Sequence, residues 1–321
     1  MYQRMLVLLD GSELAEVVFT CAEELTARLG LDVILLHVYG QAVSDFAPMH
    51  RAYIEQAADT IRRQAEETQK RLGIKPAARP LEVRGVLAMG YHADEILRYV
   101  DDNAVDLILM SSHGRSGIKR WRMGGVADKI LRASGVPVLL VRAGVPDMTP
   151  FDQWPSKTIL VPLDGSELAE SVLPHVDSLV KQRGVEPMNV TLVRVCEPPV
   201  TPSYYSPELS GVPLNWGEFM EQETTRCKQV SREYLSGIAK RFTRKRISVQ
   251  SEVLVGKASD EIIDFAIKNP FSIIVMATQG RSGLKRLVYG STAESVLMAV
   301  TNPILLIRPR LPHPAAKKKE E

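Results

Sequence analysis

Two segments of the chain combine glycines, a serine and basic residues in an order suited to binding an anion. Residues 110–131 read MSSHGRSGIKRWRMGGVADKIL, and residues 276–297 read MATQGRSGLKRLVYGSTAESVL. Each leads into an expected helix, whose N-terminal N–H groups and dipole attract negative charge. Glycine lets a backbone approach phosphate oxygens closely. The alternative is a surface loop with solvated basic residues, since neither GxxxxGK[ST] nor GxGxxG occurs.

A second repeated motif places an aspartate at the end of an apolar run. Asp10 follows "MLVLL" and Asp164 follows "ILVPL", and each is followed by Gly-Ser-Glu. One interpretation is a turn in which Ser12 or Ser166 caps a helix. The other puts the aspartate carboxylate at a cleft, where it accepts hydrogen bonds from a ribose or base. Both hold together if the cap needs only the serine.

These motifs must be positioned by a duplicated set of strands and helices. "MLVLLDGSELAE" returns as "ILVPLDGSELAE", "GYHADEIL" as "GKASDEII", and "GVPVLLVR" as "TNPILLIR". Short apolar runs typical of strands buried on both faces alternate with amphipathic helical patterns, such as one at Leu14–Leu25. This alternation predicts an α/β fold with two doubly wound parallel-sheet domains. Ligands of such sheets bind beyond the carboxyl ends of the strands.

The repeat also predicts the domain boundaries. Domain 1 is expected at residues 1–143 and domain 2 at 158–310, joined by a linker at 144–157 and followed by a disordered tail at 311–321. A Pro- and Tyr-rich insertion, EPPVTPSYYSPELSGVP, is expected to form a loop in domain 2.

Composition excludes several classes of protein. The 321 residues carry a net charge of only +2, which argues against a dedicated nucleic-acid binder. No apolar run approaches the roughly 20 residues of a membrane helix, and because an expected strand begins at once, no signal peptide is expected. Three scattered cysteines predict neither a disulfide framework nor a zinc site and favour a reducing, cytoplasmic location. No nucleophile–base pair is evident, and His92 and His113 have no copy-two counterparts that would suggest a paired metal site.

The ordered set "LVPLDGSELAE", "GRSGLKR…GS" and "NPILLIR" resembles the universal stress protein family, over nearly the whole chain and twice. The resemblance implies Rossmann-like domains with five-stranded sheets, paired about a pseudo-two-fold through their last strands. It also implies ATP binding through Gly-x₂-Gly-x₉-Gly-Ser/Thr. A further homodimer of the chain is left open.

The resemblance assigns nucleotide-binding residues in both domains. In domain 2 they are Pro162, Asp164, Val195, Met276, Ala277, Gly280, Arg281, Gly290, Ser291 and Thr292. In domain 1, where weaker binding is expected, they are Asp10, Val38, Met110, Ser111, Gly114, Arg115, Gly124, Gly125 and Val126.

The two sets depart from the motif to different extents. Domain 2 changes only the first glycine, to Ala277, whereas domain 1 has Ser111 there and Gly125 in place of the hydroxyl residue. Loss of a hydroxyl bound to phosphate costs about 1.5–3 kcal/mol, or ten- to a hundredfold in affinity. If the first position needs a positive φ, both domains are impaired.

The expected function is therefore a cytoplasmic stress-response protein that binds ATP, ADP or AMP, with magnesium bridging the phosphates and no metal ligand from the protein. Binding would regulate unknown protein partners, with at most slow ATP hydrolysis. The alternative is a protein-interaction module of the same fold with empty pockets. A true enzyme of a related fold is a third class, for which no catalytic set is visible.

Overall fold

The computed structural model describes residues 2–75, 80–112, 123–143, 153–154, 157–180, 188–198, 216–242, 247–279 and 289–309. The first half contains β1 (Arg4–Leu9), α1 (Glu13–Glu16), α2 (Phe19–Leu29), β2 (Asp32–Tyr39), η1 (Gln41–Phe46), α3 (Ala47–Arg71), β3 (Val83–Met89), α4 (His92–Asp102), β4 (Leu107–Ser111), α5 (Gly125–Ala133) and β5 (Val138–Val141). The second contains β6 (Lys157–Pro162), α6 (Glu167–Glu170), α7 (Leu173–Val180), β7 (Met188–Cys196), α8 (Trp216–Ala239), η4 (Lys240–Phe242), β8 (Ile247–Val255), α9 (Ala258–Lys268), β9 (Ser272–Ala277), α10 (Ser291–Ala299) and β10 (Ile304–Ile307). The same order of strands and α-helices thus occurs twice.

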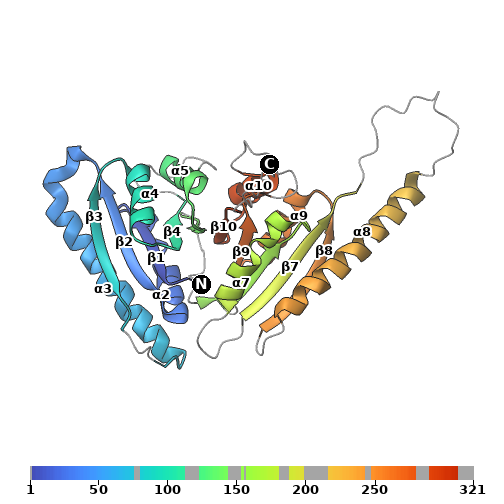
Figure 1. The fold of residues 1–321 in the computed structure, drawn as a ribbon, viewed down its shortest axis with the longest axis horizontal. Coiled ribbons are helices and arrows are strands. Elements are labelled where there is room, and N and C mark those ends of the chain that lie inside the picture. The colour runs from blue at the N-terminus through green and yellow to red at the C-terminus, as the bar shows by residue number, and fades with distance from the viewer. Residues whose placement is uncertain are drawn as a thin grey trace, which may run out of the picture.

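The strands of the described residues form one ten-stranded sheet, in the order β3-β2-β1-β4-β5-β10-β9-β6-β7-β8 (Figure 1). Within each half the neighbouring strands are parallel, as in the pairing of β1 with β2 and of β6 with β7. The halves meet where β5 and β10 pair antiparallel. The predicted fold class, two doubly wound domains about a pseudo-two-fold, is confirmed.

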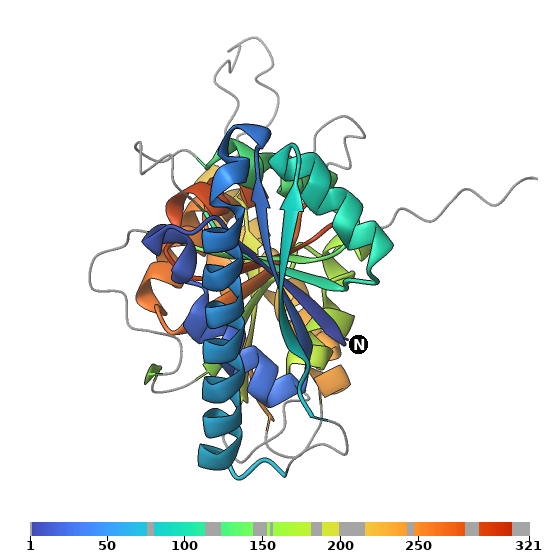
Figure 2. The same cartoon turned by 90° about the vertical axis from the view of Figure 1, so that its left-hand side faces the viewer.

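Helices cover both faces of this sheet, and each strand contributes alternate residues to two cores. On one face, α2 and α3 of domain 1 and α7 and α8 of domain 2 pack on strand residues such as Val7 and Val161. On the other, α4, α5, α9 and α10 pack on residues such as Leu6 and Leu160. The sheet is twisted, and α3 runs alongside its outermost domain 1 strand, β3 (Figure 2).

The seam between the domains is apolar and buried. Leu305 lies opposite Leu139, and Ile304 lies opposite Leu140; each of these leucines and Ile304 is at most 5% exposed. An uncovered apolar edge strand would invite association with other chains. Here each domain covers the other's last strand, as the sequence predicts.

Polar contacts across the seam repeat with the pseudo-symmetry. Arg142, after β5, donates to the carbonyls of Leu297 and Met298 at the end of α10. Arg308, after β10, donates to the carbonyl of Arg132 at the end of α5. Each arginine therefore satisfies carbonyls left open at the last turn of the other domain's helix, where positive charge also favours the helix dipole.

The predicted single helix around Leu14–Leu25 is wrong in detail, because it is divided into α1 and α2. The N–H of Val18 bonds the carbonyl of Ala15 rather than that of Leu14, and Val172 bonds Ala169 in the same way in domain 2. Such i to i−3 bonds tighten the turn and interrupt the α-helix.

In the described part of the chain, no helix is both long and apolar enough to cross a membrane. The predicted tail and most of the predicted linker and Pro/Tyr-rich loop lie outside the described residues. The domain boundaries stay predictions.

Candidate functional site

A cavity of about 560 Å³ opens at the carboxyl ends of the domain 2 strands. It lies between β6, β7 and β9 and the helices that follow them, which is where the strand order reverses. Its walls include Pro162, Leu163, Asp164, Val193, Arg194, Val195, Glu197, Cys227, Ala258, Ile262, Met276, Ala277, Thr278, Gln279, Gly290, Ser291 and Thr292. Such a crevice is the usual ligand site of an open parallel sheet.

The N-terminus of α10 forms one wall of the cavity. Gly290 is the N-cap in extended conformation, and no side chain among the described residues caps the helix. The first N–H groups of a helix have no partner within it, so those near Ser291 and Thr292 suit an anionic ligand. Gly290 itself donates its N–H to the carbonyl of Thr278, which fixes the helix start against the end of β9.

The aspartates that follow β1 and β6 hydrogen-bond within the turn that leads into the next helix, and they also lie at the carboxyl edge of the sheet. Asp164 Oδ1 accepts hydrogen bonds from the N–H of Ser166 at 2.9 Å and from its hydroxyl at 2.6 Å. Ser166 Oγ in turn accepts from the N–H of Ala169. Asp10 and Ser12 repeat this arrangement in domain 1. The cap bond itself comes from the serine alone, as expected, and Asp164 still lines the cavity. One carboxylate oxygen of Asp164 additionally holds the turn, which the sequence did not predict.

Thr278 carries a buried hydroxyl with no hydrogen-bond partner among the described residues. Its domain 1 equivalent, Ser112, accepts a hydrogen bond from the N–H of Ala143. Residue 309 occupies the position of Ala143 in domain 2, and it is a proline, which has no N–H. Buried polar groups are nearly always paired, so an orphaned hydroxyl in a cavity wall indicates a place for a ligand or water.

Arg194 contributes positive charge to the cavity and is held in place by an aromatic ring. Its guanidinium lies 4.7 Å from the ring centroid of Tyr234 on α8, a cation–π contact. It also lies against Gly165, where a Cβ would come within 3.2 Å of the guanidinium and where φ is +86°. The glycine thus permits both the turn and the close approach of the arginine.

Domain 1 differs at the same places. His37 replaces Arg194; it is buried, stacks on His50 at 4.6 Å, and its Nδ1 lies 3.1 Å from the carbonyl oxygen of Leu9. Gly124 is the N-cap of α5 and Gly125 its first residue, and a Cβ added to Gly125 would meet no described residue within 4 Å. Val126 follows in the first turn of α5, Val38 lies on β2, and Met110 and Ser111 end β4.

The predicted domain 2 residues largely come together. Pro162, Asp164, Val195, Met276, Ala277, Gly290, Ser291 and Thr292 all line the one cavity. Gly280, Arg281, Gly114 and Arg115 lie outside the described residues. Sequence reasoning missed Arg194, Glu197, Cys227 and Thr278, of which Thr278 was signalled by its place inside the repeated glycine motif.

The first motif position imposes no backbone strain. Among the described residues, Ala104 is the only non-glycine with a positive φ. Ala277 and Ser111 therefore adopt ordinary backbone conformations, and a Cβ is compatible with both.

The sequence predicts no disulfide framework, but two of the three cysteines are joined. Cys196 at the end of β7 is bonded to Cys227 on α8, while Cys21 is free and buried. The residues lie 31 apart in no recognisable motif, so their pairing depends on how α8 packs against β7.

Comparison with known sequences gives the chain's relatives. A sequence model of the universal stress protein family matches residues 1–142 and again 155–308. The universal stress protein YxiE of Bacillus subtilis is 28% identical over 150 residues, which cover 44% of this chain and all of that protein. The universal stress protein Rv2005c of Mycobacterium tuberculosis is 23% identical over 209 residues, covering 64% of this chain and 63% of that protein.

Solved structures share the fold over nearly the whole chain. A putative universal stress protein from Pseudomonas aeruginosa UCBPP-PA14 has a TM-score of 0.60 at 17% identity, covering 96% of this chain and 94% of that one. A universal stress protein from Archaeoglobus fulgidus also has a TM-score of 0.60, at 16% identity and with coverage of 95% and 96%. Two family matches that together span most of the residues, on a sheet that repeats the same strand order twice, show that the chain belongs to the universal stress protein family.

Proposed function

We propose that domain 2 binds ATP or a related adenine nucleotide, and that binding regulates a stress response rather than efficient catalysis. The observation that carries the proposal is the domain 2 cavity. It unites apolar residues, a rim aspartate, an open helix N-terminus and the unpaired hydroxyl of Thr278. Its volume falls within the range usual for small-molecule sites.

Each wall suits one part of a nucleotide. Val195 and Met276 provide apolar surface for the base, and Asp164 can accept hydrogen bonds from a ribose. The phosphates would lie against the N–H groups at the start of α10, with Ser291 donating its hydroxyl. Thr278 offers another donor close to this helix start, since Gly290 bonds its carbonyl.

The proposal also covers how nucleotide binding regulates the protein and where in the cell the protein acts. A cytoplasmic protein of this kind would change its affinity for partners when nucleotide occupies domain 2, with magnesium bridging the phosphates. Domain 1 would bind more weakly, because Gly125 lacks the hydroxyl of Ser291 and His37 replaces Arg194.

The first experiment denatures purified full-length protein and identifies any released nucleotide by chromatography. Calorimetry with ATP, ADP and AMP, with and without magnesium, then compares wild type with Gly290→Val and its pseudo-symmetric control Gly124→Val. We expect Gly290→Val to remove most of the binding and Gly124→Val to retain it. The reverse result would overturn the ranking of the domains.

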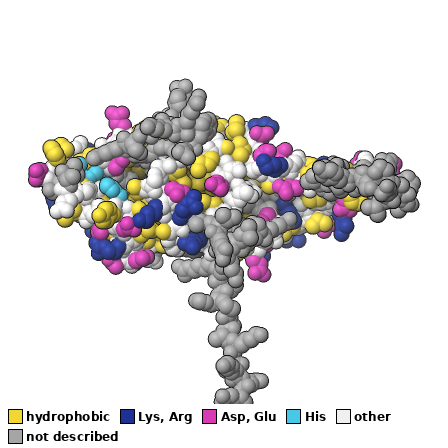
Figure 3. All heavy atoms as spheres, turned by 90° about the horizontal axis from the view of Figure 1, so that it is seen from above, with side chains coloured by type: hydrophobic (Ala, Val, Ile, Leu, Met, Phe, Trp, Pro, Cys, Tyr) yellow, Lys and Arg dark blue, Asp and Glu magenta, His cyan; other side chains and the backbone are white. Residues whose placement is uncertain are grey.

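A protein-interaction function is the second candidate, favoured by the rim of domain 1. Phe46, Met49, Met89 and Tyr91 are each more than half exposed there. Seen from above, hydrophobic and histidine side chains appear together toward the domain 1 end of the molecule (Figure 3). This candidate takes precedence if the protein releases no nucleotide and shows no heat of binding with any of the three ligands.

A further inference from the structure

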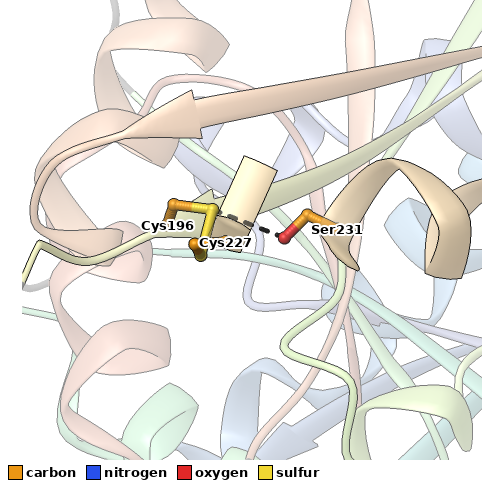
Figure 4. The surroundings of a disulfide bond; sticks show 3 residues. All are labelled: Cys196, Cys227 and Ser231. Atoms are coloured by element: carbon orange, nitrogen blue, oxygen red, sulfur yellow. Dashed lines mark hydrogen bonds between the residues drawn. A yellow bond between two sulfur atoms is a disulfide. The ribbon is translucent and has the colours of Figure 1, made fainter. Parts of the chain in front are cut away.

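The disulfide of domain 2 lies in the wall of its cavity. Cys196 is the last residue of β7 and is 2% exposed, whereas Cys227 is half-buried on α8 and lines the cavity. Figure 4 shows the bond between their two sulfurs, with Ser231 beside it. Their Cα atoms are 5.9 Å apart, within the usual range for a disulfide. The Oγ of Ser231, one turn further along α8, lies 3.4 Å from Cys196 Sγ.

The residues beside Cys196 extend this connection around the cavity. Val195 and Glu197 both line it. The Glu197 carboxylate accepts a hydrogen bond from the N–H of Ala258 at 2.8 Å, at the start of α9. The disulfide therefore fixes α8 to a strand end that also contacts α9.

Domain 1 has no such cross-link at the equivalent place. The bond from Tyr53 to Glu16 matches the bond from Tyr234 to Glu170, which aligns α3 with α8. On that alignment His50 occupies the place of Ser231. Tyr39, which matches Cys196 at the strand end, lies 6.1 Å from His50 in a stacked pair. The cross-link is thus specific to the domain whose helix start carries Ser291.

We propose that Cys196 and Cys227 form a reversible redox site that controls the domain 2 cavity. When oxidised, the pair holds α8 against β7 and preorganises the wall formed by Val195, Glu197 and Cys227. When reduced, the two sulfurs separate to non-bonded distance and the wall loses its covalent tie. The effect on affinity rests on the nucleotide function proposed above, whereas the redox chemistry does not.

The chemistry balances with a dithiol as reductant. Its thiolate attacks Sγ of Cys227, the more exposed of the two cysteines, forming a mixed disulfide and releasing the Cys196 thiolate, which takes up a proton. The second thiol then attacks the reductant's own sulfur, releasing the Cys227 thiolate and leaving the reductant as a disulfide. Two electrons pass to the protein, and a small-molecule disulfide such as oxidised glutathione reverses the exchange by leaving as two thiols.

The redox site is tested without nucleotide. Full-length protein is equilibrated in glutathione buffers of increasing oxidised fraction, blocked with an alkylating agent under denaturing conditions, and mapped by peptide mass. We expect Cys21 to be alkylated throughout, and Cys196 and Cys227 to become protected together on oxidation. Hydrogen exchange of α8 should quicken on reduction. Alkylation of all three cysteines in every buffer would overturn the proposal.

The coupling is tested by calorimetry with ATP on oxidised and reduced wild type. We expect affinity at least about threefold higher in the oxidised form, and no redox dependence in Cys227→Ser or in Cys196→Ser. Equal affinity in both states, or tighter binding after reduction, would contradict the coupling. If neither state binds ATP, ADP or AMP, the nucleotide function fails, while the alkylation map still decides whether the pair is redox-active.

Discussion

The contrast between Ser291 and Gly125 is the sharpest single-residue difference between the two helix starts. Both are the first residue of their helix, and Gly125 has open space where a side chain would begin. Ser291→Gly should weaken ATP binding ten- to a hundredfold, because about 1.5–3 kcal/mol of hydrogen bonding to a charged phosphate is lost. Calorimetry measures this change.

The reciprocal variant is the control. Gly125→Ser should fold as wild type does and leave the domain 2 affinity unchanged. An unaltered affinity in Ser291→Gly would show that the hydroxyl does not contact the ligand, even if the cavity binds it.

A second residue-scale prediction concerns the orphaned hydroxyl of Thr278. Thr278→Val removes a buried group that has no partner among the described residues, so the free energy of unfolding should stay constant or rise by up to about 1–2 kcal/mol. Nucleotide affinity should fall if the hydroxyl meets the ligand. Urea denaturation and calorimetry separate the two effects.

Ser112→Ala is the matched variant in domain 1. It removes the acceptor of the Ala143 N–H and should cost about 1–3 kcal/mol. If Thr278→Val and Ser112→Ala destabilise the protein equally, the Thr278 hydroxyl already has a hydrogen-bond partner in the folded protein.

At the scale of elements, α3 packs so closely on β3 that the strand carries a glycine, Gly85, at the contact. A Cβ at Gly85 on β3 would lie 2.9 Å from the carbonyl oxygen of Ile54 on α3, so the helix would have to move. Gly85→Ala should therefore destabilise the protein by about 1–3 kcal/mol. The measurement is the free energy of unfolding in urea.

Gly135→Ala serves as its control, because a Cβ there meets nothing within 4 Å. We expect a change within about 0.5 kcal/mol for this variant. Similar losses in both variants would show that general glycine effects, rather than the contact with Ile54, are responsible.

The elements most accessible to sequence reasoning were the strands, because strands buried on both faces read as continuous apolar runs. Their duplication predicts the doubly wound domains and the seam between β5 and β10. The break between α1 and α2 was missed, since it depends on a local choice between i−3 and i−4 bonds.

The candidate site was predictable to a similar extent and for similar reasons. Asp164 follows a strand, and Gly290 and Ser291 start a helix after another strand of the same parallel sheet. Their positions in the repeated pattern therefore predict that they lie close together at the carboxyl edge of the sheet. The orphan hydroxyl of Thr278 depends on Pro309 in another strand end, and the disulfide depends on the packing of α8. Both features depend on contacts between residues far apart in the sequence, so the spacing of neighbouring residues does not reveal them.

At the scale of the whole molecule, a histidine between the domains should make stability depend on pH. The Tyr2 hydroxyl lies 2.7 Å from His175 Nδ1. Burial lowers the pKa of His175 from 6.5 to about 4, and burial followed by the charge of Asp106 raises that of Tyr2, so the tyrosine stays protonated. The folded protein therefore favours a neutral imidazole that is hydrogen-bonded to the tyrosine hydroxyl.

The direction in which stability changes with pH depends on whether the folded or the unfolded chain binds a proton at the higher pH. Between pH 6.5 and about 4 the unfolded chain protonates His175 while the folded chain does not, so stability is complete above this window and falls as pH drops through it. We expect a loss of about 1–2 kcal/mol after allowing for partial exposure. Urea denaturation at pH 7.5 and 4.5 measures it, and His175→Gln should reduce the slope. An unchanged slope in that variant would assign the pH dependence to other groups.

The antiparallel pairing of β5 with β10 within one chain also removes a constraint that symmetry imposes. Two identical subunits related by a two-fold axis must carry every substitution twice. Two domains fused in one chain have no such obligation, so equivalent positions can hold different residues. Gly125 corresponds to Ser291, His37 to Arg194, and Tyr39 to Cys196. Each half can thus diverge toward its own task, while the continuous sheet and the arginine contacts across the seam keep the two halves connected.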